Sequence, residues 1–141
     1  MQKIYDYLEK LDVIRDVPLF FIRVVLAYGF WIPGMKKYDN FESIIEWFTT
    51  LGIPLPTLNA YLATATEIVG AVLLLLGLFT RLISIPLIVV MLVAIFSVHI
   101  GNGFESSNNG FEIPLYYLLM LLTLVAFGGG KISLDAILNK K

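Results

Sequence analysis

Three ionisable side chains stand inside long apolar segments of the sequence: Glu67, His99 and Arg23. A charge at the centre of a membrane-spanning helix costs at least about 2.5–3.5 kcal/mol, so such residues usually face the protein interior and serve a function. Glu67 lies about seven residues from the nearer end of its segment, roughly 10 Å at 1.5 Å per residue. We therefore expect its carboxyl group to point inward. The alternative role is a structural hydrogen bond to Thr64, a tyrosine or a basic partner.

Three further polar side chains, at Lys37, Glu112 and Tyr116, are predicted to lie near Glu67 and His99. A carboxylic acid and an imidazole at one depth can hydrogen-bond a ligand and transfer protons, with Lys37 as a third polar group. Glu112 and Tyr116 are candidate ligand-binding residues. The alternatives are an interfacial hydrogen bond for His99, a helix cap for Glu112, and the aromatic belt of the membrane for Tyr116.

Arg23 is a more ambiguous candidate for ligand binding. It lies one to two turns from the end of its segment, where a long side chain can extend to the lipid head groups. We expect this extended arrangement, with an interior pairing as the alternative. A pair with Glu67 would have to bridge about 12 Å of depth, so Lys37 is the favoured basic partner of Glu67.

The composition excludes several kinds of redox centre. The chain has no cysteine, which excludes disulfides, thiolate metal sites and iron–sulfur clusters. It has one histidine, which excludes a multi-histidine metal or haem site. We therefore expect no metal, haem or iron–sulfur cofactor. The net charge of −1 gives no reason to expect a nucleic-acid partner.

The elements that must position these residues are apolar helices. The chain is 58% hydrophobic and 15% charged, whereas a soluble domain has about 25% charged residues. The segments 18–33, 60–79, 82–100 and 111–127 each approach the roughly 20 apolar residues that span a bilayer. The sequence predicts an all-α integral membrane protein, a four-transmembrane-helix bundle over residues 18–138, whose interior side chains form the site.

Two amphipathic segments flank this bundle. Residues 1–17 are predicted to contain a helix that lies on the membrane surface or packs under the bundle. Apolar residues recur at helical spacing between 41 and 51, which predicts a second interfacial helix before the proline-rich turn at 52–56. The acidic N-terminal segment does not resemble a cleavable signal peptide.

The distribution of lysine and arginine predicts the orientation. Cationic residues concentrate in cytoplasmic loops, and seven here fall on one predicted side against two on the other. The seven are Lys3, Lys10, Arg15, Arg81, Lys131, Lys140 and Lys141, and the two are Lys36 and Lys37. Both termini are therefore predicted to be cytoplasmic, which places the polar site in the outer half of a bacterial-type inner membrane.

An ordered set of short motifs runs along most of the chain. In order they are Arg23, GMKK at 34–37, LGIPLP at 51–56, EIVG at 67–70, LLLLGLFTR at 73–81, MLVA at 91–94, VH at 98–99, GFEIPL at 110–115 and SLD at 133–135. By this ordered set, rather than by one motif, the chain resembles the DoxX family from about residue 19 to residue 138.

This resemblance implies a link to quinone chemistry. The family takes its name from a subunit linked to a terminal quinol oxidase and to thiosulfate:quinone oxidoreductase. It also resembles four-helix thiol oxidoreductases that bind quinone. This chain lacks their cysteines, so the resemblance implies quinone binding without thiol chemistry.

Three functions compete at this point. The first is a membrane subunit of a quinone-linked oxidoreductase, which is not redox-active alone and receives electrons from a partner redox subunit. The second is a non-enzymatic scaffold or assembly subunit whose polar residues lock the bundle. The third is a small-molecule transporter. The sequence has no internal repeat, which argues against a transporter, although a homo-oligomer could still form a pathway.

Overall fold

The computed structural model describes residues 4–5, 8 and 10–140, and every regular element in that part of the chain is helical. Within residues 1–17, where the sequence predicts an amphipathic helix, residues 1–3, 6–7 and 9 lie outside the described residues, and α2 already begins at Asp16. Of this segment, the structure shows a short 3-10 helix, η1, at Lys10–Ile14.

Three helices are long and apolar enough to cross a membrane. They are α2 (Asp16–Asp39), α4 (Pro56–Leu76) and the continuous helical stretch that begins with α5 (Thr80–Ala94). This stretch continues as a π-helix, η2 (Ile95–His99), and a 3-10 turn, η3 (Ile100–Asn102). The predicted all-α, membrane-spanning fold is therefore present.

The fourth predicted span forms a shorter helix. α6 (Glu112–Phe127) has 16 residues and is apolar along its length. Between α2 and α4 lies α3 (Phe41–Thr50), at the position where the sequence predicts the second interfacial helix. A 3-10 turn, η4 (Ser106–Asn108), precedes α6, and a short α7 (Leu134–Leu138) follows it.

The first span extends further than the sequence suggested. We expected it to end near residues 31–34, but α2 runs through Pro33 to Asp39. In lipid a helix keeps its backbone hydrogen bonds internal, so a proline is tolerated within a membrane-spanning helix. Gly34 also lets α2 approach α4, since a Cβ there would lie 3.0 Å from Ile68 Cγ1. Lys37 consequently sits on a helix instead of in a loop.

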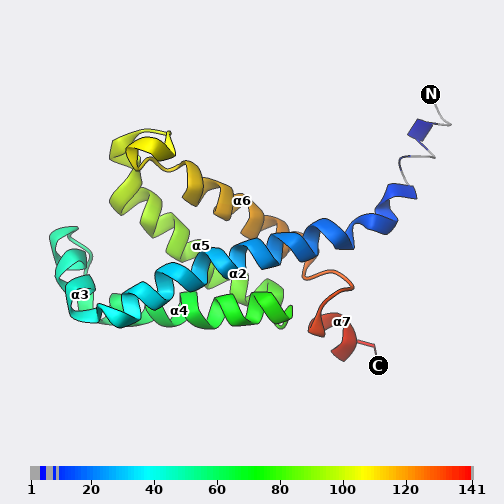
Figure 1. Cartoon of the computed structure of the whole chain (residues 1–141), viewed down its shortest axis with the longest axis horizontal. Helices are drawn as coiled ribbons and strands as arrows, with labels where there is room; N and C mark the ends of the chain where they lie inside the picture. Colours follow the sequence, from blue (N-terminus) through cyan, green and yellow to red (C-terminus); the bar gives the residue numbers. More distant parts are fainter. Residues whose placement is uncertain (1–3, 6–7, 9, 141) are drawn as a thin grey trace.

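The helices form two pairs that meet at one end of the molecule. α2 packs along α4 and α5 packs along α6, while α2 and α6 touch only slightly. The short turn at residues 77–79 makes α4 and α5 antiparallel neighbours. Figure 1 shows the pairs converging near this turn and separating toward α3 and the loop before α6.

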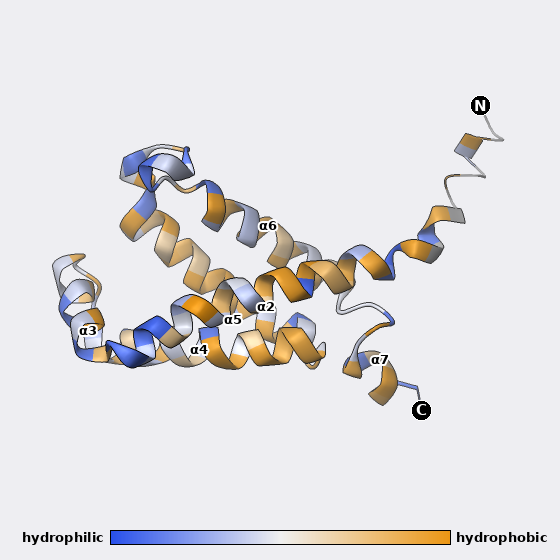
Figure 2. Cartoon of the chain, viewed as in Figure 1, coloured by the Kyte–Doolittle hydropathy of each residue, from blue (hydrophilic) through white to orange (hydrophobic). Residues whose placement is uncertain are grey.

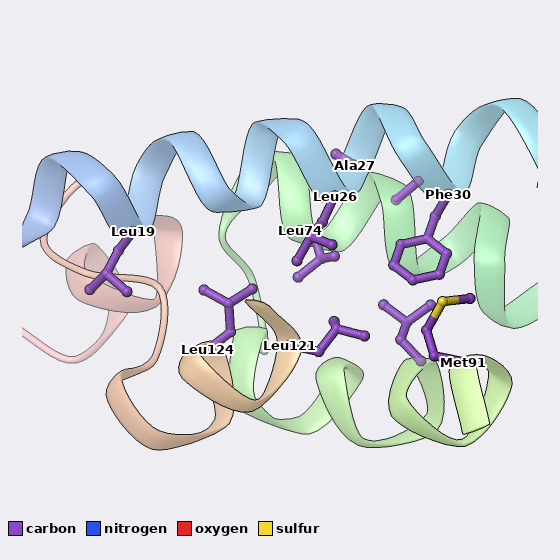
Figure 3. Close-up of a cluster of buried hydrophobic side chains, with 10 residues drawn as sticks. Leu19, Leu26, Ala27, Phe30, Leu74, Met91, Leu121 and Leu124 are labelled. Carbon is purple, nitrogen blue, oxygen red and sulfur yellow. The ribbon is translucent and has the colours of Figure 1, made fainter. Parts of the chain in front are cut away.

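A continuous apolar core holds the pairs together where they converge. Leu26 and Phe30 of α2 meet Leu74 of α4, Met91 of α5 and Leu121 of α6, and all five are buried (Figure 3). Figure 2 shows that apolar residues dominate the middle of the helices, whereas hydrophilic residues gather at α3 and the loop before α6.

The segment after α6 closes the converging end of the bundle. Ser133 caps α7 by accepting a hydrogen bond from the Ala136 N–H at 3.2 Å. The carboxylate of Asp135 accepts hydrogen bonds from the N–H groups of Phe79 and Thr80, at 2.7 and 2.9 Å. Asp135 therefore caps the start of α5 from a distant part of the chain.

Removing this distant cap should destabilise the fold moderately. We expect Asp135→Ala to lower the free energy of unfolding by about 1–2 kcal/mol, because two N–H groups lose a charged acceptor. Thermal unfolding in detergent measures this. Asp39→Ala is the control, since exposed Asp39 accepts no hydrogen bond from the described residues, and a similar loss in both variants would contradict the cap.

Candidate functional site

A buried ion pair between α2 and α4 is the main polar contact inside the helical region. Lys37 Nζ lies 2.7 Å from Glu67 Oε1 and 2.6 Å from Oε2. The side chain of Glu67 is 3% exposed and that of Lys37 is 16% exposed. Across residues 4–5, 8 and 10–140 it is the only salt bridge. Lys37, the favoured basic partner, is therefore the one that Glu67 has.

The helix geometry explains why these two residues meet. Gly34 brings α2 close to α4 beside Glu67, and one turn later along α2 comes Lys37. The alternative partner Thr64 stands one turn before Glu67, but its hydroxyl is buried with no hydrogen-bond partner among the described residues. Both carboxylate oxygens of Glu67 accept hydrogen bonds from Lys37, and the ammonium group is the donor of the pair.

The ion pair faces a large cavity between the diverging helix pairs. This cavity has a volume of about 930 Å³, and Lys37, Glu67 and His99 all line it. Its walls are mainly apolar and include Phe30 and Met91. A cavity of a few hundred to about 1,000 Å³ with few polar groups is typical of a small-molecule site.

A local change of helix type carries His99 toward this cavity. His99 ends the π-helix η2, and such π-turns occur often at functional sites. Its Nδ1 lies 2.8 Å from the backbone oxygen of Asn109. A carbonyl oxygen only accepts, so Nδ1 carries the proton of this hydrogen bond, and Nε2 has no hydrogen-bond partner among the described residues.

Glu112 and Tyr116 lie outside the cavity lining. Glu112 Oε2 accepts a hydrogen bond from the Ser106 N–H at 2.9 Å, and the Tyr116 hydroxyl donates to Oε1 at 3.0 Å. These contacts tie the loop before α6 to the first turns of that helix. Glu112 therefore neither lines the cavity nor caps α6, because the first N–H groups of α6 receive no side-chain hydrogen bond.

Arg23 is also remote from the cavity, and our expectation that it reaches the head groups is wrong. Its side chain is 1% exposed. Nη1 donates to the backbone oxygen of Leu74 at 3.1 Å, and Nη2 donates to that of Ile132. The segment after α6 folds over α2 and supplies the second acceptor, which makes an interior position favourable for the guanidinium group.

Several lining residues were not predicted as site residues. Trp47 and Phe48 belong to α3, which the sequence indicated only as an interfacial helix, yet both line the cavity. Tyr117 also lines it and packs edge-to-face on Phe30, with ring centroids 5.6 Å apart. Gly29 makes room for Tyr117, because a Cβ there would overlap the Tyr117 hydroxyl. Only the tertiary structure reveals this match.

The fold and the site together define a class: a small, helical, multi-spanning membrane protein with a polar pair in an apolar cavity. The family model DoxX matches residues 18–100, more than half of the chain. The chain belongs to the DoxX family, as the sequence motifs suggested.

Known relatives are similar over most of their length. An uncharacterized Haemophilus influenzae protein is 37% identical over 138 residues, which covers 95% of this chain and 100% of the relative. The protein named "Inner membrane protein YphA" of Escherichia coli is 30% identical, over 86% of this chain and 90% of its own. The Bacillus subtilis protein named "Putative oxidoreductase CatD" is 29% identical, with shares of 89% and 90%. No solved structure matches the chain significantly.

Proposed function

We propose that this DoxX protein is the membrane subunit of a quinone-linked oxidoreductase and binds a quinone in the cavity beside Lys37, Glu67 and His99. The observation that carries the proposal is the ion pair facing a mainly apolar cavity of about 930 Å³. The name of the Bacillus subtilis relative contains the word oxidoreductase, which favours the same class of function.

The side chains fit the two ends of such a ligand. A quinone is an apolar ring with carbonyl acceptors, and it supplies two-electron, two-proton redox chemistry when bound. Lys37 Nζ has three N–H groups and bonds only to the two Glu67 oxygens among the described residues, which leaves one N–H for a carbonyl oxygen. His99 Nε2 is free to accept a hydrogen bond from a hydroxyl group of the reduced form. Glu67 holds Lys37 in place.

The proposed topology has four spans with both termini in the cytoplasm of a bacterial-type cell. Arg15, Arg81 and Lys131 lie together at the converging end of the bundle. Lys36 and Lys37 lie near the other end of α2. The positive-inside rule then assigns the cavity to the outer half of the bilayer. The side chains of Lys37, Glu67 and His99 are not redox-active, so a partner redox subunit supplies the electrons.

Mass spectrometry of lipids extracted from the purified protein tests this function. We expect near-stoichiometric quinone with the wild type, and its loss in Glu67→Gln and in His99→Ala, because each removes a group that orients the ligand. Glu46→Gln is the matched control, since Glu46 is exposed on α3 and outside the cavity lining. Equal quinone in all four proteins, or none in the wild type, would contradict the proposal.

One observation favours the scaffold as the second candidate. The Lys37–Glu67 pair joins α2 to α4 through two hydrogen bonds, so it can hold the two helices together without any ligand. A scaffold predicts that the same variants lose stability or partner retention while no bound quinone is found in any of the proteins.

A further inference from the structure

A second pocket lies at the converging end of the bundle, away from the cavity. It has a volume of about 460 Å³ and is formed by the start of α2, the start of α5 and the segment after α6. Three cationic side chains line it: Arg15, Arg81 and Lys131. All three are exposed, and the proposed function uses none of them.

The two carboxylates in this pocket are already engaged by the backbone. Asp16 Oδ1 accepts the Lys131 N–H at 2.9 Å. Asp135 accepts the N–H groups at the start of α5. Within the described part of the chain, no carboxylate lies within salt-bridge distance of the three cations. Three cations against two carboxylates leave the pocket with a net charge of +1, and none of the three cations forms an ion pair within the described residues.

Backbone rather than side chains forms one wall of the pocket. The glycine run at residues 128–130 lies there, and Gly128 and Gly130 both have a φ of +76°. Arg81 packs close to this wall, because a Cβ on Gly128 would lie 3.2 Å from Arg81 Nε. The glycines thus keep the pocket open beside a guanidinium group.

Apolar side chains surround the cations. Phe79, Leu82 and Phe127 line the same pocket and are 58%, 66% and 56% exposed. These positions adjoin the ends of the apolar helices α4, α5 and α6. A ligand in this pocket would meet a cationic site and, directly beside it, a surface suited to hydrocarbon.

We propose that this pocket binds the phosphate head group of an anionic phospholipid, with its acyl chains along Phe79, Leu82 and Phe127. Basic pockets between membrane helices commonly bind such head groups, and each nearby lysine or arginine strengthens the attraction. The apolar border favours a lipid over a free phosphate ion, because a phosphate ion has no hydrocarbon group to contact these side chains. The proposal is independent of quinone binding.

Native mass spectrometry of the full chain in detergent, with added phosphatidylglycerol or phosphatidylcholine, tests the proposal. The wild type should bind phosphatidylglycerol and retain it in preference to phosphatidylcholine. Lys131→Gln should weaken that binding about fivefold, and the Arg81→Gln/Lys131→Gln double variant about 30-fold. Lys36→Gln is the matched control, an exposed lysine at the other end of α2, and should change nothing.

Further measurements separate lipid binding from the alternatives. Arg81→Lys keeps the charge and should retain most of the binding, while gel filtration checks that every variant is folded. Equal retention of the two lipids, or a double variant that binds like the wild type, would overturn the proposal. Displacement of phosphatidylglycerol by millimolar inorganic phosphate would overturn it in favour of a free-anion site.

Discussion

Replacing Lys37 with methionine should lower the free energy of unfolding by about 3 kcal/mol. The substitution leaves the carboxyl group of Glu67 buried without its partner, and breaking a buried pair on one side costs about 3–5 kcal/mol. We expect the lower end of that range because Lys37 retains some exposure. Thermal unfolding in detergent, compared with Lys36→Met on the exposed face of the same helix, measures the loss.

The Lys37→Met/Glu67→Met double variant should recover most of this stability, because apolar residues of similar size often replace a buried ion pair without cost. It should not recover quinone, since it lacks the donor that faces the cavity. A double variant that loses the sum of the two single losses would show that the residues are not coupled. A stable double variant that binds quinone like the wild type would contradict the proposed function.

Gly77→Ala should be the most damaging small substitution at the converging end. Gly77 has a φ of +67°, and a Cβ there would overlap Arg23 Nη1 and lie 2.6 Å from Ser133 Cβ. We expect a loss of about 2–4 kcal/mol, from a left-handed backbone penalty of about 1–2 kcal/mol and overpacking of similar size. Thermal unfolding and hydrogen exchange of the segment after α6 measure the effect.

Gly52→Ala separates the two causes. Gly52 has a φ of +72°, but nothing lies within 4 Å of a Cβ there. This control should therefore lose only the backbone part, about 1–2 kcal/mol. Equal losses at Gly52 and Gly77 would mean that Arg23 and Ser133 move aside at little cost, and that the buried guanidinium group is not held rigidly.

Local patterns in the sequence account for most of the helices. The apolar segments predicted the positions of α4 and α6 to within a few residues, because these depend on the residues of each segment. The end of α2 depends on Gly34 packing against Ile68, a contact 34 positions away along the chain. Hydropathy carries no information on that contact, so the extension to Asp39 was missed.

In the candidate site, too, local sequence predicted some features, and contacts between distant residues determine the others. Depth along a helix was enough to favour Lys37 over Arg23 as the partner of Glu67. The interior position of Arg23 could not be predicted, because its acceptor on Ile132 lies 109 residues away. The π-turn before His99 leaves no signature in the residue types. The lining by Trp47 and Phe48 follows from where α3 folds back, which its own amphipathic pattern does not specify.

The shortness of α6 has a consequence for the membrane around the protein. Its 16 residues extend about 24 Å at 1.5 Å per residue, against a hydrocarbon thickness of about 30 Å. In the proposed four-span topology, the bilayer beside α6 must thin by several ångströms or the loop before α6 must sink into the head groups. Either adjustment is confined to the α5–α6 side, because α2 is long enough to match an undistorted bilayer. The protein would thus impose an uneven thickness on its lipid shell, and thinner membranes would accommodate it at lower cost.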